Sequence, residues 1–305
     1  MPPSLATTLC GIPFKNPVIA ASGTYAYGVE FKALADLNAL GGIVVKGLSR
    51  EPMEGNPPPR LFETEAGMIN SVGLQNIGVR AFVREKLPEL RQFDTAVIAN
   101  VFGYAVEDYV EVAQVLDEAE GVAAYELNVS CPNTKHGGIF FSSDPLLLDE
   151  VVKAVRKVTR RPLLVKLSPN VTRIEPLARA AAEAGADAIS LINTLVALGI
   201  DARTRRARLG AGFGGLSGPA IKPIALRMVY EAAQAVKVPV IGLGGIATGM
   251  DAAEFLIAGA SAVQVGTVNF WDPQAPARIA RELAGFLKEE NIGDVSQLVG
   301  TLRLK

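Results

Sequence analysis

The chain has 305 residues, of which 49% are hydrophobic and 20% are charged, a composition typical of a folded globular protein. Its 30 lysine and arginine residues nearly balance its 31 acidic residues, and this balance argues against a nucleic-acid-binding protein. The sequence contains no apolar run of membrane-spanning length and no signal-peptide pattern in residues 1–8, so we expect a cytoplasmic location.

Eight short apolar segments, each bounded by glycine, proline or a polar residue, are predicted to be buried strands. They are residues 17–21, 42–46, 96–100, 124–128, 163–167, 188–193, 239–242 and 262–266. Amphipathic stretches with helical periodicity lie between some of them, at residues 149–159, 174–184, 221–235 and 251–258. This alternation predicts an α/β protein with a single (β/α)₈ barrel domain over residues 1–305, in preference to an open sheet.

Three segments are too long to be tight turns, namely residues 48–79, 130–144 and 194–218. We expect them to be long loops at the carboxyl-terminal face of the barrel, where such loops form lids and binding sites. The third segment contains Gly210-x-Gly212-x-x-Gly215, which has the spacing of a dinucleotide fingerprint. Because it follows no predicted strand and opens no predicted helix, we interpret it as a flexible loop and predict no nicotinamide site on this chain.

Polar or glycine residues follow the predicted strands at the end where a barrel builds its active site. They are Ser22, Lys46, Asn100, Asn128, Lys166, Asn193, Gly244, Gly245, Gly266 and Thr267. Helix capping or turn formation is a sufficient explanation for Ser22 and Asn100 taken alone. A lysine at the rim of a barrel core needs an anionic partner, and Lys46 and Lys166 are therefore predicted to face a bound anion.

The last two strands lead into glycine-containing turns, Gly242 to Gly245 and Val265 to Thr267. Loops in these positions of a barrel commonly bind phosphate through backbone N–H groups. Asparagine side chains at other strand ends offer both donors and acceptors, as a flat heterocycle requires. The residues by themselves are compatible with a flavin, a pyrimidine or both.

The chain has two cysteines, too few for a disulfide framework or a four-cysteine cluster, and no metal site is predicted. Cys131 follows a predicted strand and begins a glycine-containing loop, a placement that favours a nucleophile or base over a buried hydrophobic residue. We interpret the single histidine, His136, as a solvated loop residue, and the arginines at 203, 205, 206 and 208 as a solvated charged surface.

Several motifs resemble those of the dihydroorotate dehydrogenases over essentially the whole chain. These are Glu126-Leu127-Asn128-Val129-Ser130-Cys131-Pro132-Asn133, Asn70-Ser71-Val72-Gly73-Leu74-Gln75-Asn76, Lys166-Leu167-Ser168-Pro169-Asn170, Ile192-Asn193-Thr194 and Gly215-Leu216-Ser217-Gly218-Pro219. The family folds as a (β/α)₈ barrel, carries FMN and oxidises (S)-dihydroorotate to orotate in pyrimidine synthesis. The resemblance therefore implies that fold, that cofactor and that reaction for this chain.

The resemblance also implies roles for individual residues. Cys131 would be the catalytic base that takes the C5 proton while a hydride leaves C6 for the flavin. Residues implied to contact FMN are Ser22, Lys46, Gly47, Asn100, Asn128, Lys166, Ile192, Gly218, Gly244, Gly245, Gly266 and Thr267. Residues implied to contact the substrate are Lys46, Asn70, Ser71, Val72, Gly73, Leu74, Asn128, Asn193 and Thr194.

Within the family, the motifs at 73–76, 134–138 and 166–170 resemble those of the NAD-linked type, class 1B. That type implies a homodimeric core paired with a second subunit that carries FAD and a [2Fe–2S] cluster, giving a heterotetramer. Membrane-bound members use a serine base, so Cys131 argues against that type.

Four alternatives remain open. A fumarate-linked class 1A enzyme and a dihydropyrimidine dehydrogenase catalytic subunit share the barrel, the flavin and the cysteine loop. A Schiff-base aldolase would use Lys46 or Lys166 on a phosphate-binding barrel. A barrel that only docks a partner would show no turnover.

Overall fold

The computed structural model describes residues 2–130, 141, 143–304 of the chain. Eight parallel strands close into a barrel in the order β10-β15-β16-β3-β4-β7-β8-β9. Their bounds are β3 (Val18–Ala20), β4 (Gly42–Val44), β7 (Ala96–Val101), β8 (Ala124–Asn128), β9 (Leu163–Lys166), β10 (Ala188–Leu191), β15 (Val240–Leu243) and β16 (Ala262–Val265). Each lies within or overlaps a predicted strand, so the predicted (β/α)₈ barrel is confirmed.

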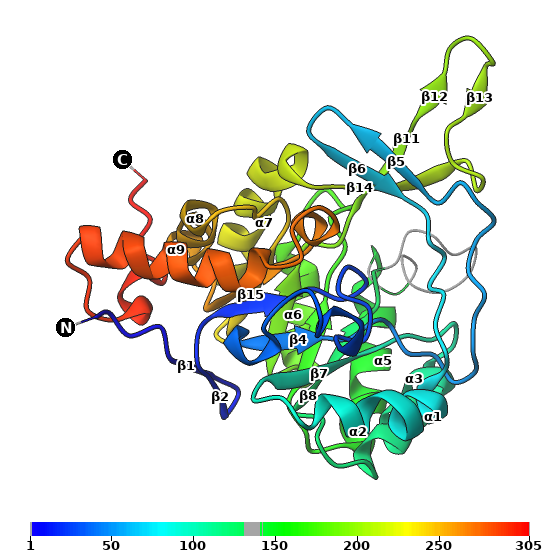
Figure 1. Ribbon diagram of the computed structural model, residues 1–305. Coiled ribbons are helices and arrows are strands. Elements are labelled where there is room, and N and C mark those ends of the chain that lie inside the picture. The colour runs from blue at the N-terminus through cyan, green and yellow to red at the C-terminus, as the bar shows by residue number, and fades with distance from the viewer. Residues whose placement is uncertain (1, 131–140, 142, 305) are drawn as a thin grey trace.

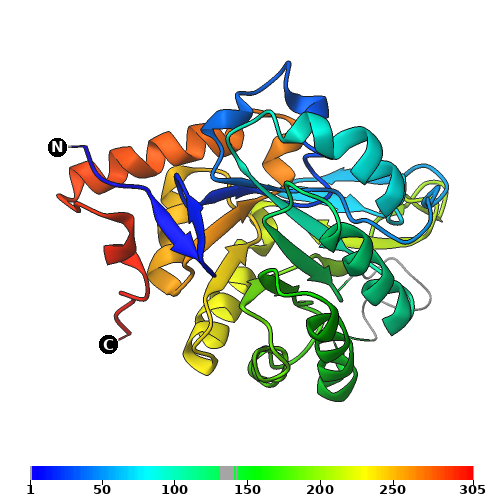
Figure 2. The ribbon, with the colours of Figure 1, turned by 90° about the horizontal axis from the view of Figure 1, so that it is seen from below.

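The longer helices lie around the barrel strands (Figure 2). They are α3 (Val106–Asp117), α5 (Pro145–Val158), α6 (Glu175–Glu183), α7 (Lys222–Ala235), α8 (Gly249–Ala258) and α9 (Ala275–Glu289). Shorter helical segments are α1 (Val79–Ala81), a π-helical turn (Phe82–Lys86), α2 (Leu87–Leu90) and the 3-10 helices Val29–Phe31, Leu37–Ala39, Pro219–Ile221, Thr267–Phe270 and Val295–Leu298. None of the helices in the described part of the chain has the length and hydropathy needed to cross a membrane.

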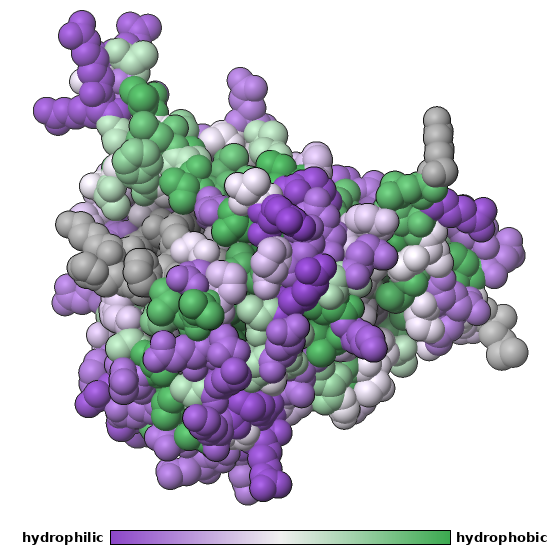
Figure 3. All heavy atoms as spheres, turned by 180° about the vertical axis from the view of Figure 1, so that it is seen from behind, coloured by the Kyte–Doolittle hydropathy of each residue, from purple (hydrophilic) through white to green (hydrophobic). Residues whose placement is uncertain are grey.

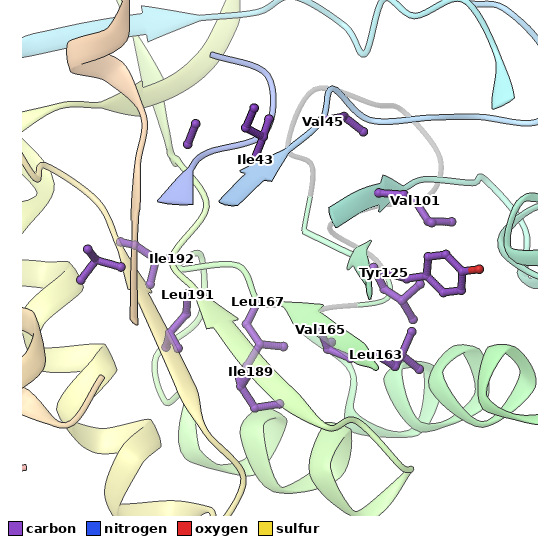
Figure 4. Packing of buried hydrophobic residues seen from close by; sticks show 14 of the residues in the cluster. Ile43, Val45, Val101, Tyr125, Leu163, Val165, Leu167, Ile189, Leu191 and Ile192 are labelled. Atoms are coloured by element: carbon purple, nitrogen blue, oxygen red, sulfur yellow. The ribbon is translucent and has the colours of Figure 1, made fainter. Parts of the chain in front are cut away.

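Helix α5 illustrates how the sequence fixes a helix and its buried face. It begins at Pro145, earlier than predicted, because the Asp144 side chain accepts a hydrogen bond from the Leu146 amide and proline suits the first helical position. Leu148, Val151 and Val155 recur at helical spacing and are fully buried. Figure 4 shows barrel side chains of the same hydrophobic cluster, including Leu163 and Val165 of β9.

Two of the three segments expected to be long loops instead form an antiparallel sheet above the barrel (Figure 1). Its strands are β5 (Leu61–Thr64), β6 (Gly67–Asn70), β14 (Phe213–Ser217) and β11 (Leu195–Leu198), and β12 (Ile200–Asp201) pairs with β13 (Arg206–Ala207) in a projecting hairpin. The interpretation of 210–215 as a flexible loop is therefore wrong. Gly214 and Gly215 lie in β14, where the absence of a side chain permits close pairing with β6 and β11.

This sheet and the projecting hairpin also expose apolar side chains. Leu61, Val196, Leu198, Ile200 and Phe213 are each between 43% and 62% exposed. Seen from behind, hydrophobic side chains gather at the base of the projecting hairpin, whose tip is hydrophilic (Figure 3). At the other end of the barrel, β1 (Thr7–Leu9) and β2 (Ile12–Phe14) form a hairpin that closes the barrel floor.

Candidate active site

The barrel interior changes from apolar to polar toward the carboxyl ends of its strands. Side chains two residues apart on a strand point to the same side, so the interior is built in layers. The lower layer is Ile19, Val44, Ile98, Ala124, Leu164, Ala188, Ile241 and Ala262, closed below by Leu9 and Phe14. Two residues further along each strand the chain places Ala21, Lys46, Asn100, Glu126, Lys166, Ser190, Leu243 and Gln264. This second layer brings five buried polar or charged side chains together: Asn100, Glu126, Lys166, Ser190 and Gln264.

Glu126 is the hydrogen-bonding centre of this polar layer and is fully buried. Its carboxylate accepts hydrogen bonds from Asn100 Nδ2 at 2.8 Å and from Gln264 Nε2 at 2.6 Å. Ser190 Oγ donates at 2.9 Å, and Lys166 Nζ lies 3.5 Å from Oε1. These donors come from four other strands and compensate the cost of burying the carboxylate.

A cavity opens directly above this layer, at the carboxyl ends of the barrel strands. Its free space, including the part open to solvent, is about 1140 Å³, enough for a cofactor together with a small substrate. The predicted residues on its wall are Ser22, Lys46, Gly47, Asn70, Val72, Gly73, Leu74, Asn128, Lys166, Ile192, Asn193, Thr194, Gly218, Gly244, Gly245, Gly266 and Thr267. Segments far apart in sequence thus converge on one site.

Two predicted residues in the described part of the chain are not on this wall. Asn100 is fully buried behind it, beside Glu126. Ser71 is buried among loop residues, where its hydroxyl accepts a hydrogen bond from Asn56 Nδ2 at 2.8 Å. Cys131 lies outside the described residues, as does His136. The other cysteine, Cys10, is in the barrel floor, where burial and Asp187 raise the pKa of its thiol to about 11.

Lys46 provides positive charge on the cavity wall. Burial is the main cause that lowers the pKa of its ammonium group, and the nearby Arg60 guanidinium lowers it further. Among the described carboxylates none forms an ion pair with Lys46. A partly buried lysine in this position favours an anionic ligand.

One end of the cavity is lined by Gly244, Gly245 and Gly266 and is called the glycine end here. It lets a ligand approach the backbone. Gly245 has a φ of +80°, and a Cβ atom there would lie 2.8 Å from the Gly218 carbonyl oxygen. The position therefore requires glycine, and its neighbours Gly244, Gly266 and Thr267 also face the cavity. Backbone amides with no side chain in front of them suit a phosphate group.

The rest of the wall consists of residues that were not predicted from the sequence, namely Ala21, Gly23, Thr24, Ser217, Ile221, Leu243, Gln264 and Phe270. Gln264 and the supporting residues Glu126 and Ser190 are inside strands, whereas the prediction considered strand ends. The alternation of side chains along a strand could have identified them, because each lies two positions after an apolar residue that points into the barrel.

Gly215 sets the position of Thr194 on the cavity wall. A Cβ atom at Gly215 would lie 1.9 Å from Thr194 Oγ1 and 2.6 Å from Thr194 Cβ, so Gly215→Ala must displace that side chain. The family resemblance implies that Thr194 contacts dihydroorotate, and on that basis we expect the variant to raise the KM for this compound by about tenfold, as loss of one hydrogen-bonding partner does, with less change in kcat. Steady-state kinetics test this. Gly293→Ala is the control because a Cβ there meets nothing within 4 Å, and equal KM values in both variants would contradict the expectation.

The fold and cavity together define a barrel enzyme with a cofactor-sized polar site. Residues 4–287 match the family model described as dihydroorotate dehydrogenase. The chain is 74% identical over 303 residues to a protein of Solibacter usitatus named putative dihydroorotate dehydrogenase A (fumarate), covering 99% of this chain and all of that one. It is 55% identical over 302 residues to the dihydroorotate dehydrogenase B (NAD(+)) catalytic subunit of Geobacter sulfurreducens, covering 99% of each chain.

Among solved structures, dihydroorotate dehydrogenase from Eimeria tenella in complex with ferulenol superposes with a TM-score of 0.82 at 24% identity, covering 98% of this chain and 88% of that one. This likeness supports the fold. The chain belongs to the dihydroorotate dehydrogenase family. The predicted family, its resemblance to the NAD-linked catalytic subunits, the oxidoreductase class and the FMN cofactor are confirmed.

The described residues fit FMN on structural grounds. The cavity combines a glycine end suited to phosphate with two lysines suited to the electron-rich edge of a flavin.

Proposed function

We propose that this cavity binds FMN and (S)-dihydroorotate side by side and carries out the family's reaction, the oxidation of dihydroorotate to orotate in pyrimidine biosynthesis. The observation that carries the proposal is the convergence of Lys46, Lys166, the asparagines and the glycine end on one cavity. Residues 1–305 would act as one FMN-binding catalytic domain.

The glycine end and Thr267 would hold the FMN phosphate, and Ser22, Gly47, Asn100, Ile192 and Gly218 would support the flavin. When bound, FMN supplies the hydride acceptor. Lys166 would stabilise negative charge on the reduced flavin, because it lines the cavity as well as pairing with Glu126 at 3.5 Å.

Residues 70–74, Asn128, Asn193 and Thr194 would bind the pyrimidine and its carboxylate, with Lys46 between substrate and cofactor. The asparagines are themselves held in place: Asn193 Nδ2 donates to Ser130 Oγ at 2.8 Å, and Ser130 Oγ donates to Asn128 Oδ1 at 3.2 Å. Cys131 directly follows Ser130 in the sequence. We propose that its thiolate removes the C5 proton of dihydroorotate as the hydride leaves C6.

For the electron acceptor we propose NAD, reached through a partner subunit that carries FAD and a [2Fe–2S] cluster, in the cytoplasm. Relatives that are 52–55% identical are named NAD(+)-linked catalytic subunits. The chain's two cysteines are too few to bind such a cluster. The exposed apolar side chains on the four-stranded sheet and the projecting hairpin support assembly into a homodimeric core and a heterotetramer.

Fumarate is the second candidate acceptor, because the relative that is 74% identical carries the fumarate-linked name. The experiment is to reduce the purified chain with dihydroorotate without oxygen and then add NAD or fumarate separately. We expect the reduced flavin to persist with either one, and NAD to reoxidise it once the partner subunit is added. Rapid reoxidation by fumarate alone would assign the chain to the fumarate-linked class.

A further inference from the structure

The turn that follows β15, at residues 244–248, brings two backbone amides to the cavity. Gly244 and Gly245 both line the cavity and are partly exposed. Neither amide donates a hydrogen bond to another group in the described part of the chain. Both donors are therefore available to a ligand, and how well they bind it depends on how firmly the backbone of the turn is held.

The side chain of Asp251, which is not on the cavity wall, holds the other end of this turn. Its Oδ2 atom accepts hydrogen bonds from the backbone amides of Ala247 and Thr248, both at 2.9 Å. In a capping box the acidic side chain binds only the N-cap amide, which here is that of Thr248. Asp251 thus does more than cap α8, because Ala247 lies before the helix and only two residues after Gly245.

Lys222 connects the turn to a second segment of the cavity wall. Its Nζ atom lies 2.6 Å from Asp251 Oδ1 and 2.8 Å from Glu254 Oε2. Lys222 begins α7, directly after the cavity residue Ile221. A Cβ atom at Gly245 would lie 2.8 Å from Lys222 Cβ, so the two segments are in close contact. The pair between Lys222 and Asp251 therefore ties together two parts of the wall that belong to different β/α units.

The ammonium group of Lys222 is not itself offered to a ligand in the cavity. Lys222 is not on the cavity wall, and its charge lies between two carboxylates. It also balances the charge of Asp251, which would otherwise repel an anion bound at the turn. The geometry therefore gives Lys222 and Asp251 an indirect role, through the backbone that they hold.

We propose that Asp251 and Lys222 are positioning residues that fix the turn at 244–248 in the conformation that binds the FMN phosphate. The inference rests on the proposed binding of FMN in this cavity. Asp251 holds the backbone at 247 and 248, and Lys222 anchors Asp251 to the start of α7. Their effect should fall on the phosphate, which the turn binds, and not on the flavin ring.

The test compares the affinities of the flavin-free protein for FMN and for riboflavin, which lacks the phosphate. Flavin fluorescence quenching gives both dissociation constants without turnover, and their ratio isolates the contribution of the phosphate. We expect the unmodified protein to prefer FMN by about a hundredfold or more, since two hydrogen bonds to a charged group each contribute roughly tenfold. Asp251→Ala should lower this preference to about tenfold or less, and change the riboflavin affinity by less than about twofold.

Glu254→Ala is the matched control. Glu254 lies on the same helix and also pairs with Lys222, but the amides of Ala247 and Thr248 donate to Asp251 and not to Glu254. This variant should keep the preference for FMN within about twofold of that of the unmodified protein. A purely structural role for Asp251 would lower both flavin affinities and leave their ratio unchanged.

Two Lys222 variants test the ion pair, and they decide the question if Asp251→Ala does not fold. Lys222→Met leaves the Asp251 charge without its cation, so the preference for FMN should fall by about tenfold. Adding Asp251→Asn removes that charge and keeps an oxygen that accepts from the turn. The double variant should therefore regain part of the preference.

The outcomes separate the inference from the proposed function. An unchanged preference for FMN in Asp251→Ala, or an equal loss in Asp251→Ala and Glu254→Ala, would overturn the inference and leave the proposed function intact. Equal affinity of the unmodified protein for both flavins would do the same. An unchanged preference in Lys222→Met would overturn the role of Lys222. Failure of the unmodified protein to bind either flavin would overturn both the inference and the proposed function.

Discussion

Cys131→Ala is expected to retain bound FMN and to lose flavin reduction by dihydroorotate by a factor of about 10²–10⁴, the usual contribution of a positioned general base. The variant removes the group proposed to take the C5 proton, while the phosphate and flavin contacts assigned to the barrel rim remain. Anaerobic stopped-flow absorbance measures the rate of flavin reduction directly, and the flavin content of the purified variant measures cofactor binding.

Cys131→Ser sharpens this test through its pH dependence. A hydroxyl loses its proton at a much higher pH than a thiol, whose ordinary pKa is about 8.5. The rate for the serine variant should therefore be low at neutral pH and rise toward alkaline pH. Cys10→Ser is the control, because Cys10 is in the barrel floor with its Sγ donating to the Asp187 carbonyl oxygen. Near-normal reduction in Cys131→Ala would remove Cys131 from the mechanism.

Lys166→Met is expected to lower the free energy of unfolding of the flavin-free protein by about 3–5 kcal/mol, the cost of leaving one member of a buried ion pair without its partner. The Lys166 side chain is 7% exposed and that of Glu126 is fully buried, so solvent cannot compensate for the missing charge. Urea denaturation followed by circular dichroism measures the change.

Two companion variants identify the cause of this loss. Lys153→Met removes the same side chain from an exposed pair with Asp149, at a shorter distance of 2.9 Å, and should cost less than about 1 kcal/mol. Adding Glu126→Gln to Lys166→Met removes the unpaired charge and should restore part of the stability. A loss in Lys166→Met no greater than that in Lys153→Met would show that the buried pair is not strongly coupled.

The barrel was predictable because its eight strands are short, apolar and separated by helical patterns. The sheet above it was not, because β6 pairs with β14 across about half the chain and each strand alone resembles a glycine-rich loop. Pairing between distant segments is set by tertiary contacts and leaves little trace in local periodicity. Helix α5 began earlier than expected because Asp144 and Pro145 supply its start signal before the first periodic apolar residue.

Site residues were predictable where they lie at the ends of strands or within the family motifs. Lys46, Lys166 and Asn128 are of this kind, and all three face the cavity. Glu126 and Gln264 were missed as site residues although they lie on β8 and β16, because a polar residue inside an apolar strand shows its role only when the barrel closes. Glu126 and Gln264 are far apart in sequence, yet their side chains meet at 2.6 Å.

The most direct test of the central claim is to purify the chain, mix it with (S)-dihydroorotate in the absence of oxygen, and record the visible flavin absorbance. The account predicts a yellow protein with about one FMN per chain that bleaches as orotate forms in equal amount. A colourless protein, or a yellow one whose absorbance dihydroorotate leaves unchanged, would contradict it.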